Sequence, residues 1–397
     1  MVKKIAIVGG GIVGLAAALK VSQRYPQAML HLFEKEATVG EHQSGNNSGV
    51  LHCGLYYKPG SLKAKLAVEG IREMIQFCVE NDIPHEVCGK LVVATNPIEV
   101  SRLDDLEPRG RQNGLKGIQR LCGGEIQDHE PYAVGLAALK VPEEGIVDYG
   151  KVCSTLKNML EEVGHSIHIG TRILSGRLTG SKFQLSSYED EWEFDYVVNC
   201  AGLHSDRVCR QLGGQPSVKI IPFRGEYYKL RENSQRLVNN LIYPVPDPAF
   251  PFLGVHFSRL IRGGVEAGPN AVLAFSREGY RKRDVKLADL AEVAAFPGIW
   301  KFAAKYRRMC LGELMQSFSR KLFCRNLQKL IPSINESDLE PGGAGVRAQA
   351  MSPYGSLVED FAFVEGEKIL HVLNAPSPAA TASLAIGGEI ASRINLN

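Results

Sequence analysis

A glycine-rich turn near the N-terminus places the tightest constraint on the fold of this chain. The run KKIAIVGGGIVGLAAALKVSQRY starts with β-branched residues, passes through Gly9, Gly11 and Gly14, and continues with alanine and leucine. This order and the spacing G-x-G-x-x-G predict a buried strand, a tight turn and a helix. A second predicted strand, residues 28–35, carries Glu34 where a carboxylate can accept hydrogen bonds from the ribose of an adenosine. The segment therefore predicts a dinucleotide-binding fold.

Two later segments fit the same fold and indicate which dinucleotide is bound. Residues 193–208 predict another buried strand, followed by a turn at Cys200, Ala201 and Gly202. Residues 368–394 predict a strand, a turn and a terminal helix that starts near Ala379. The N-terminus of that helix would stabilise the negative charge of a reduced flavin, although an ordinary terminal helix fits the residues equally well. Because only one G-x-G-x-x-G occurs, FAD without a nicotinamide partner is favoured.

Composition and charge exclude several other classes of protein. The chain has 397 residues, 44% of them hydrophobic and 22% charged, which suits a globular protein of about two domains. A net charge of +3 is too balanced to predict a nucleic-acid partner. The nine cysteines form no Cys-x-x-Cys pair, so we expect free thiols, no metal site and a cytoplasmic protein. The early first strand predicts no leader peptide, and no apolar run approaches the ~18 residues that span a bilayer.

Four longer runs resemble the L-2-hydroxyglutarate dehydrogenase/oxidase family of the D-amino-acid oxidase superfamily. They are HQSGNNSGVLHCGLYYKPGSLKAKL, PFRGEYYKL, YPVPDPAFPFLGVHF with GPNAVLAFSREGYRKRD, and AGVRAQAMSPYGSLVEDF with NAPSPAAT, and they extend from residue 42 to 381. The resemblance implies FAD as cofactor and oxidation of L-2-hydroxyglutarate to 2-oxoglutarate by hydride transfer from Cα to flavin N5. A quinone or oxygen would then receive the electrons. The chain departs from the family pattern at Asn46, where histidine is common, and at Ser44, where threonine is common.

The predicted fold class is α/β, with two domains built from interleaved segments. A Rossmann-like FAD-binding domain of the D-amino-acid oxidase type is expected from residues 1–85, 145–220 and 340–397. A second α+β domain, built on a mixed or antiparallel sheet, is expected to bind the substrate from residues 86–144 and 221–339. Residues 286–330 are expected to be helical.

The small-residue loop that opens the first resembling run is predicted to lie along the cofactor. Ser44, Asn47, Ser48 and Gly49 would pass under the pyrophosphate and the edge of the isoalloxazine, because bulkier side chains would block the ring. Further predicted cofactor contacts, from the first turn and from the later segments that the resemblance assigns to FAD, are Ile12, Val13, Lys35, Ile173, Ser205, Gly345, Arg347, Asn374, Ala375, Pro376, Ser377, Ala379, Ala380 and Thr381.

Two arginines are candidates for holding the carboxylates of a 2-hydroxy dicarboxylate substrate. An arginine fork binds a carboxylate through two parallel hydrogen bonds. Arg347 lies in a predicted buried strand, where an unpaired guanidinium is costly, and the comparable arginine of the superfamily holds the substrate carboxylate. Instead of binding the substrate, Arg347 could form a structural ion pair with Glu359 or Asp360. Arg224 is the second candidate, and it could instead pair with Glu226.

A histidine is the expected base, because histidine titrates near neutral pH without perturbation. We prefer His256 as the base, since alternation along its strand would direct its side chain into the pocket, and we place His52 along the flavin. Two alternatives stay open: the two histidines could have the opposite roles, or either could be a core histidine whose hydrogen bonds are satisfied by the backbone. Tyr57 and Tyr228 are predicted to donate to substrate oxygens, with aromatic packing as the alternative. Asn374 is predicted to meet the flavin or the substrate.

A basic segment, residues 301–330, suggests contact with a partner outside the active site. It has eight basic residues against one acid, Glu313, with apolar residues between them. Such helices can lie on an anionic membrane and so reach a membrane quinone, whereas a solvated helix face is the alternative. Two other functions stay open: an amino-acid or amine oxidase of the same superfamily, and a non-catalytic flavin-binding protein.

Overall fold

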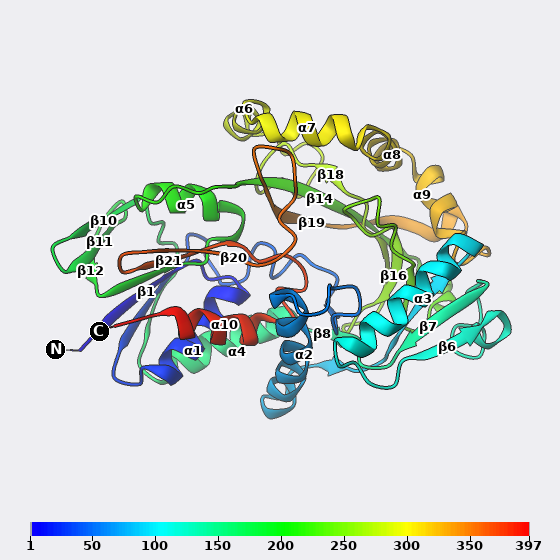
Figure 1. The fold of residues 1–397 in the computed structure, drawn as a ribbon, viewed down its shortest axis with the longest axis horizontal. Coiled ribbons are helices and arrows are strands. Elements are labelled where there is room, and N and C mark those ends of the chain that lie inside the picture. The colour runs from blue at the N-terminus through cyan, green and yellow to red at the C-terminus, as the bar shows by residue number, and fades with distance from the viewer. Residues whose placement is uncertain (1, 397) are drawn as a thin grey trace.

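The first large sheet contains the strands predicted around the glycine turn. The computed structural model describes residues 2–396, and six of its strands lie in the order β20-β21-β13-β1-β2-β9 (Figure 1). Only the edge pair β20 and β21 is antiparallel. The strands are β1 (Lys4–Val8), β2 (Met29–Phe33), β9 (Ser166–His168), β13 (Tyr196–Asn199), β20 (Ala362–Gly366) and β21 (Ile369–Asn374). Because parallel strands end at the same edge, the turns after β1, β13 and β21 meet there.

The turn between β1 and α1 (Ile12–Arg24) has the geometry that its glycines allow. Gly9 has φ of +115°, a conformation that L side chains rarely adopt. A Cβ atom on Gly14 would lie 1.9 Å from the carbonyl oxygen of Gly9, so helix and turn can pack this closely only around glycine. The turn and the start of α1 are therefore fixed by residues that are consecutive in the sequence.

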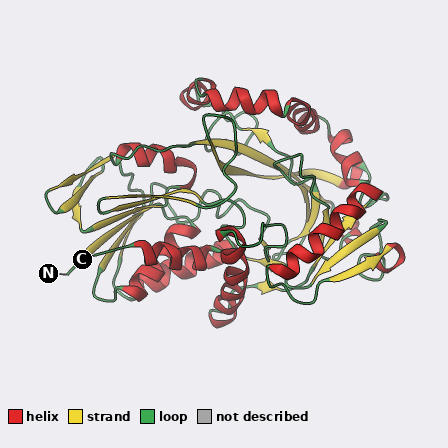
Figure 2. Cartoon of the chain, viewed as in Figure 1, coloured by secondary structure: helices red, strands yellow, loops and turns green. Residues whose placement is uncertain are grey.

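Helices cover one face of this sheet, as Figure 2 shows. Helix α1 packs against α4 and α10, and α10 also contacts α2. The bounds are α2 (Leu62–Glu80), α4 (Tyr149–Glu162), α5 (Ser205–Gln211) and α10 (Ser383–Arg393). Helix α10 begins after the predicted start at Ala379, because the preceding residues form turns in which the N–H of Ala382 donates to the carbonyl of Pro378. A three-stranded sheet, β10 (Ser175–Thr179), β11 (Lys182–Ser186) and β12 (Glu191–Phe194), lies beside the first sheet.

The second large sheet is mixed and has nine strands. Its longest pair is β14 (Lys219–Leu230) with β19 (Leu339–Met351), antiparallel along most of both strands. The other members are β5 (Lys90–Ala94), β6 (Gln119–Cys122), β7 (Ala137–Val141), β15 (Leu241–Pro244), β16 (His256–Arg259), β17 (Val265–Gly268) and β18 (Val272–Leu273). Because β19 pairs with β14, residues 339–351 belong to this sheet, whereas the sequence assigned 340–397 to the cofactor domain.

Smaller elements connect and cover the two sheets. The short strands β3 (Val50–Leu51), β8 (Gly145–Val147) and β4 (His85–Glu86) form a separate sheet, and α3 (Pro97–Gln112) packs on β5 and β7. Four helices lie in a row along the outside of β14 and β18 (Figure 1): α6 (Leu287–Ala294), α7 (Pro297–Lys305), α8 (Arg307–Phe318) and α9 (Arg320–Leu327).

The predicted α/β fold class and the helical character of residues 286–330 are thus confirmed. None of the described helices is both long enough and apolar enough to cross a membrane.

Candidate active site

A cavity of about 910 Å³ is lined by residues of both large sheets and by the loops at the edge where the turns meet. It contains most of the side chains that the sequence singled out. The predicted site residues that line it are Gly11, Ile12, Val13, Ser44, Asn47, Ser48, His52, Tyr57, Cys200, Gly202, Ser205, His256, Gly345, Arg347, Ala375, Pro376, Ser377, Ala379, Ala380 and Thr381. Residues separated by more than 300 positions therefore meet at one place.

Several residues predicted to contact the cofactor lie behind this lining. Gly9 and Gly14 shape the turn, and Gly49 follows the lining residue Ser48. Ile173 belongs to a buried apolar cluster, and Ala201 packs against that cluster. The carboxylate of Glu34 accepts a hydrogen bond from the N–H of Gly10 at 2.8 Å, which holds it beside the turn.

Lys35 is also outside the lining of the cavity. Its ammonium pairs with Glu36 and, at 2.7 Å, with Glu278, and His42 and His204 contact the same carboxylates. The ammonium of Lys35 therefore lies in an ion-pair cluster, and its contact with the cofactor stays a prediction.

Three predictions for substrate contacts differ from the structure. Arg224 donates twice to Glu226, at 2.9 and 3.1 Å, so its guanidinium is held by a neighbour on its own strand. Tyr228 packs against the ring of Phe323, with the centroids 4.7 Å apart. The amide of Asn374 donates to two carbonyl oxygens of the loop that precedes β20, at 2.8 and 2.9 Å, and does not line the cavity.

Tyr227 faces the cavity in place of Tyr228. Adjacent residues of a strand point to opposite faces, and β14 carries an irregularity in its register between Glu226 and Tyr228. The sequence identified the tyrosine pair but not which member faces the substrate. Tyr57 does line the cavity, and its hydroxyl donates to the carbonyl of Ser377 at 3.3 Å.

Arg347 lies on β19 with its guanidinium at the cavity. It donates to the carbonyl of Asn270 at 3.4 Å and lies 5.5 Å from the centroid of the Phe252 ring. Within residues 2–396 it forms no ion pair with a carboxylate, so the alternative pairing with Glu359 or Asp360 is not found. Burial lowers the pKa of Arg347. A half-buried guanidinium without a carboxylate partner among the described residues can donate two parallel hydrogen bonds to a bound carboxylate.

His256 points into the cavity, while Val255 and Phe257 pack in an apolar cluster, as strand alternation predicted. Its Nδ1–H donates to the carbonyl of Gly254 at 3.0 Å, and its ring stacks on Tyr243 with the centroids 3.8 Å apart. Burial lowers the pKa of His256 to about 3, and the nearby charges of His52 and Arg347 act in the same direction. The expectation that this histidine titrates near neutral pH is therefore wrong.

His52 also lines the cavity and is held from behind by a buried carboxylate. Its Nδ1 lies 3.2 Å from Oε2 of Glu144, and Oε1 of Glu144 lies 2.8 Å from the ammonium of Lys90. Burial raises the pKa of Glu144, but Lys90 and His52 outweigh this effect and hold the pKa well below its usual value. The sequence analysis missed this group. The only available sign was a lysine in the apolar strand KLVVA, which requires a buried anion.

Two further cations of the cavity were also missed. Lys63, at the start of α2, lies 4.5 Å from the centroid of the Tyr57 ring, and Arg109 of α3 donates to the carbonyl of Tyr56 at 3.3 Å. Over the described part of the chain, neither is in an ion pair with a carboxylate. Burial lowers the pKa of Lys63 to about 8.

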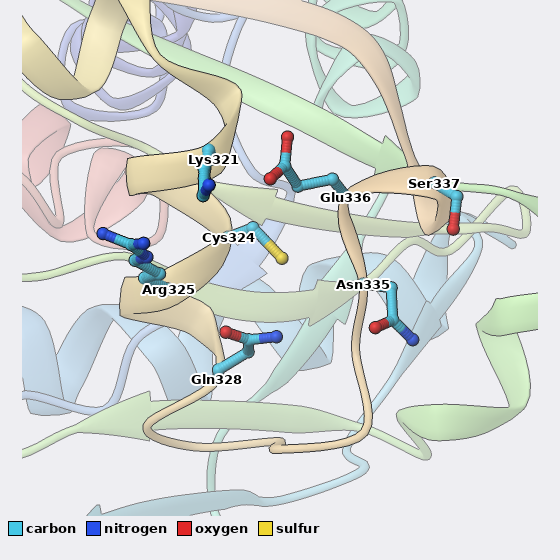
Figure 3. Close-up of a pocket in the computed structure, with 7 residues that line it drawn as sticks. All are labelled: Lys321, Cys324, Arg325, Gln328, Asn335, Glu336 and Ser337. Atoms are coloured by element: carbon cyan, nitrogen blue, oxygen red, sulfur yellow. The ribbon is translucent and has the colours of Figure 1, made fainter.

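A second, smaller pocket of about 410 Å³ lies between α9 and the loop that follows it. Figure 3 shows the thiol of Cys324 directed between helix and loop, with Lys321 on the helix and Glu336 on the loop beside it. None of the predicted site residues lines this pocket. The chemistry therefore concentrates in the larger cavity.

The residues of the larger cavity fit FAD. Gly11, Ile12 and Val13 place the N-terminus of α1, a site for anionic phosphates, in the cavity wall. A Cβ on Gly11 would meet only the hydroxyl of Ser44, at 3.3 Å, so the backbone at this position is open to a ligand. The loop 375–381 lines the cavity as well. This arrangement of turn, helix N-terminus and unpaired arginine defines a flavin-dependent oxidoreductase.

Comparison with known proteins agrees. Residues 4–393 match the family described as FAD dependent oxidoreductase, and the chain belongs to this family. It is similar to two proteins named L-2-hydroxyglutarate dehydrogenase: it is 51% identical to one from Indibacter alkaliphilus, over 98% of this chain and 97% of that protein. It is 44% identical to one from Salmonella houtenae, over 98% of this chain and 92% of that protein. The resemblance inferred from the sequence and the choice of FAD are thus confirmed.

A solved structure shows the same fold. It is the dithionite-reduced L-alpha-glycerophosphate oxidase from Mycoplasma pneumoniae with FAD bound. Its TM-score to this chain is 0.78 at 21% identity, with 99% of this chain and 94% of that chain covered. At this identity the likeness concerns the fold alone.

Proposed function

We propose that this protein oxidises L-2-hydroxyglutarate to 2-oxoglutarate with FAD. The observation that carries the proposal is Arg347, whose guanidinium lies in the same cavity as the glycine turn and has no carboxylate partner among residues 2–396. The name shared by relatives 51% and 44% identical to this chain supports the particular substrate. The proposed domain division keeps the cofactor on the first sheet and the substrate under the second, with residues 339–351 moved to the latter.

Arg347 holds the carboxylate next to the hydroxyl-bearing carbon. Its guanidinium donates two parallel hydrogen bonds to the carboxylate, which fixes the orientation of Cα as well as its position. Tyr227 lies beside Arg347 and adds a hydroxyl to the same wall. A five-carbon dicarboxylate needs a second cation, and Lys63, rather than Arg224, supplies it, because Arg224 is already paired with Glu226.

His52 takes the proton of the substrate hydroxyl. Its Nδ1 faces Glu144, which leaves Nε2 for the cavity. His256, with its pKa lowered to about 3, stays neutral and serves as a hydrogen-bond partner. The preferred roles of the two histidines are therefore exchanged relative to the sequence analysis. Bound FAD would supply the hydride acceptor; with the hydride lost from Cα and the hydroxyl proton taken by His52, the alcohol would lose two electrons and two protons in all and become a ketone.

The electrons leave reduced FAD for a quinone in this proposal, with oxygen as the alternative acceptor. Support comes from the outer helices, where Leu311, Met315 and Phe318 are 60%, 58% and 76% exposed among the basic residues of 301–330. Exposed aromatic and basic side chains together favour peripheral binding to an anionic membrane. Flotation with anionic vesicles, compared with neutral vesicles, tests this contact. A cytoplasmic location is proposed from the nine free cysteines.

The reaction is tested by an anaerobic absorbance spectrum of the FAD-loaded protein before and after stoichiometric L-2-hydroxyglutarate. Rapid bleaching of the flavin by the L-form, and not by D-2-hydroxyglutarate or L-malate, is the expected result. Bleaching by glycine, sarcosine or a D-amino acid with release of ammonia would instead identify an amine oxidase. A fully loaded protein that no hydroxy or amino acid reduces would be a non-catalytic flavin-binding protein.

A further inference from the structure

We propose that Glu144, restrained by Lys90, is the positioning residue that sets the orientation and the proton affinity of His52. The proposal rests on the proposed function, in which His52 takes the hydroxyl proton. Glu144 does not line the cavity and so acts only through the histidine. Among residues 2–396, only Glu144 forms an ion pair both with a histidine of the cavity and with a fully buried lysine.

Three separate elements bring this group together. Glu144 lies in the turn between β7 and β8 and is 1% exposed. Lys90 starts β5 with its side chain wholly buried, and His52 follows β3. Oε1 of Glu144 also accepts hydrogen bonds from the N–H and the thiol of Cys53, both at 3.2 Å. The carboxylate therefore has fixed partners on every side and cannot rotate away from the imidazole without breaking them.

The contact with Glu144 decides which nitrogen of His52 carries the proton. An ionised carboxylate only accepts hydrogen bonds, so Nδ1 must be the donor and the neutral ring has its lone pair on Nε2. The backbone N–H of His52 is fixed as well, because it donates to Oγ1 of Thr381 at 3.1 Å. The ring is thus presented to the cavity in the tautomer that a base requires.

Lys90 limits how strongly the carboxylate attracts a proton to the histidine. Its ammonium lies 2.8 Å from Oε1 of Glu144 and 4.6 and 4.9 Å from the ring centroids of Tyr56 and Tyr243. With Lys90 in place, the buried carboxylate is already neutralised before His52 accepts a proton. The pair therefore holds the ring in one orientation through a carboxylate whose charge is balanced by Lys90.

Four other side chains surround His52, and none of them is an ion-pair partner of its ring. Tyr243 of β15 meets its ring edge to face, with the centroids 6.3 Å apart. On β16, the pKa of His256 is lowered by burial and further by the charges of His52, Arg347 and Lys90. The thiol of Cys53 and the hydroxyl of Tyr56 stay protonated, because burial raises both pKa values well above their usual range. Glu144 and Lys90 are thus the charged pair closest to the imidazole.

The experiment measures the rate of flavin reduction by L-2-hydroxyglutarate across pH in stopped flow, with FAD-loaded variants. For Glu144→Gln we expect a limiting rate about 10- to 100-fold lower, because the amide can donate to Nδ1 and turn the ring to the wrong tautomer. We also expect the acidic limb of the profile to move to lower pH, since Lys90 is left uncompensated beside the ring. Glu144→Asp, which keeps the charge, should recover part of the rate.

The opposite shift is expected for Lys90→Met. Without the ammonium, the carboxylate favours the imidazolium, so the acidic limb moves to higher pH. A buried pair that loses one partner can unfold, so the double variant Glu144→Gln with Lys90→Met, which removes both charges, is measured as well. It should lie between the two single variants in pH dependence while keeping the low limiting rate.

The matched control is Glu143→Gln. Glu143 is the preceding residue, but its carboxylate is partly exposed and lies 3.6 Å from Arg72 on the surface. If the variants at Glu144 and Glu143 give the same profile, the proposal is wrong. If all folded variants change in rate but none in pH dependence, Glu144 is merely structural and the proposal is also wrong. A wild-type protein that L-2-hydroxyglutarate does not reduce would instead refute the proposed function itself.

Discussion

Substitution of Arg347 by lysine tests the substrate site most directly. Arg347 is anchored on the long strand β19, which pairs with β14 on one side, so the change should leave the backbone in place. Its guanidinium donates to the carbonyl of Asn270 and lies over the ring of Phe252, and it forms no ion pair with a carboxylate among residues 2–396. The variant keeps the positive charge and loses the planar fork. The expected effect is therefore on the bound carboxylate rather than on folding.

The size of the effect follows from the hydrogen bonds that are lost. A hydrogen bond to a charged group contributes about 1.5 to 3 kcal/mol. Lysine can replace one of the two parallel bonds but not both, so we expect a loss of about 2 kcal/mol in transition-state stabilisation. This corresponds to a decrease of about 30-fold in kcat/KM.

The assay is steady-state turnover of L-2-hydroxyglutarate with an artificial electron acceptor, with FAD occupancy measured from the absorbance spectrum. Arg262→Lys is the matched control, since Arg262 pairs with Asp148 at the surface and is 77% exposed. Exposed pairs contribute little, so this variant should behave as the wild type. An unchanged kcat/KM for Arg347→Lys at full FAD occupancy would refute the assignment of Arg347 as the carboxylate ligand.

Four other variants test the remaining roles. His52→Ala should slow flavin reduction by ~10²-fold or more with FAD still bound, and His256→Ala should have a smaller effect; the reverse order in stopped flow would make His256 the base. Because burial lowers the pKa of Lys63 to about 8, its ammonium is lost above that pH, so KM for L-2-hydroxyglutarate should rise there. Lys63→Met should raise KM at all pH values and abolish this rise, but should leave KM for the monocarboxylate 2-hydroxybutyrate unchanged; equal effects on both substrates would argue against a second clamp. Arg224→Ala should cost about 1 to 3 kcal/mol of stability, because the half-buried carboxylate of Glu226 loses two hydrogen bonds and is left with Lys282 at 3.6 Å, and should lower Tm with KM intact. A raised KM at unchanged Tm would return Arg224 to the substrate site.

Local sequence patterns predicted the glycine turn and the elements on either side of it. The glycine turn, the strand after it and the helix N-terminus depend on residues within a single run, so their types determine their geometry. Within the loop from Ser44 to Ser48, Asn47 makes a local contact by donating to the carbonyl of Ser44 at 2.8 Å, whereas the hydroxyl of Ser44 accepts from the N–H of Ile12 at 2.9 Å and so joins the loop to the start of α1.

The substrate half was predicted less well, because its side chains depend on contacts that the sequence does not contain. A single irregularity in the register of β14 turns Tyr227, and not Tyr228, to the cavity. Arg224 looked available as a clamp, and only the strand geometry shows that Glu226, two residues along on the same face, holds it. A position in a strand indicates two possible faces, and packing selects one of them.

The sequence by itself determined that this chain binds a dinucleotide, that its family uses FAD, and that arginine and histidine carry the chemistry. Only the tertiary structure decided how the histidines divide their roles. Glu144 and Lys90 lie 92 and 38 positions from His52 in the sequence. In the fold, Glu144 lies within ion-pair distance of both Lys90 and the ring of His52, whereas burial lowers the pKa of His256 and keeps that ring neutral. Proton affinity depends on neighbouring charges and on the loss of water, and both are set by the folded structure.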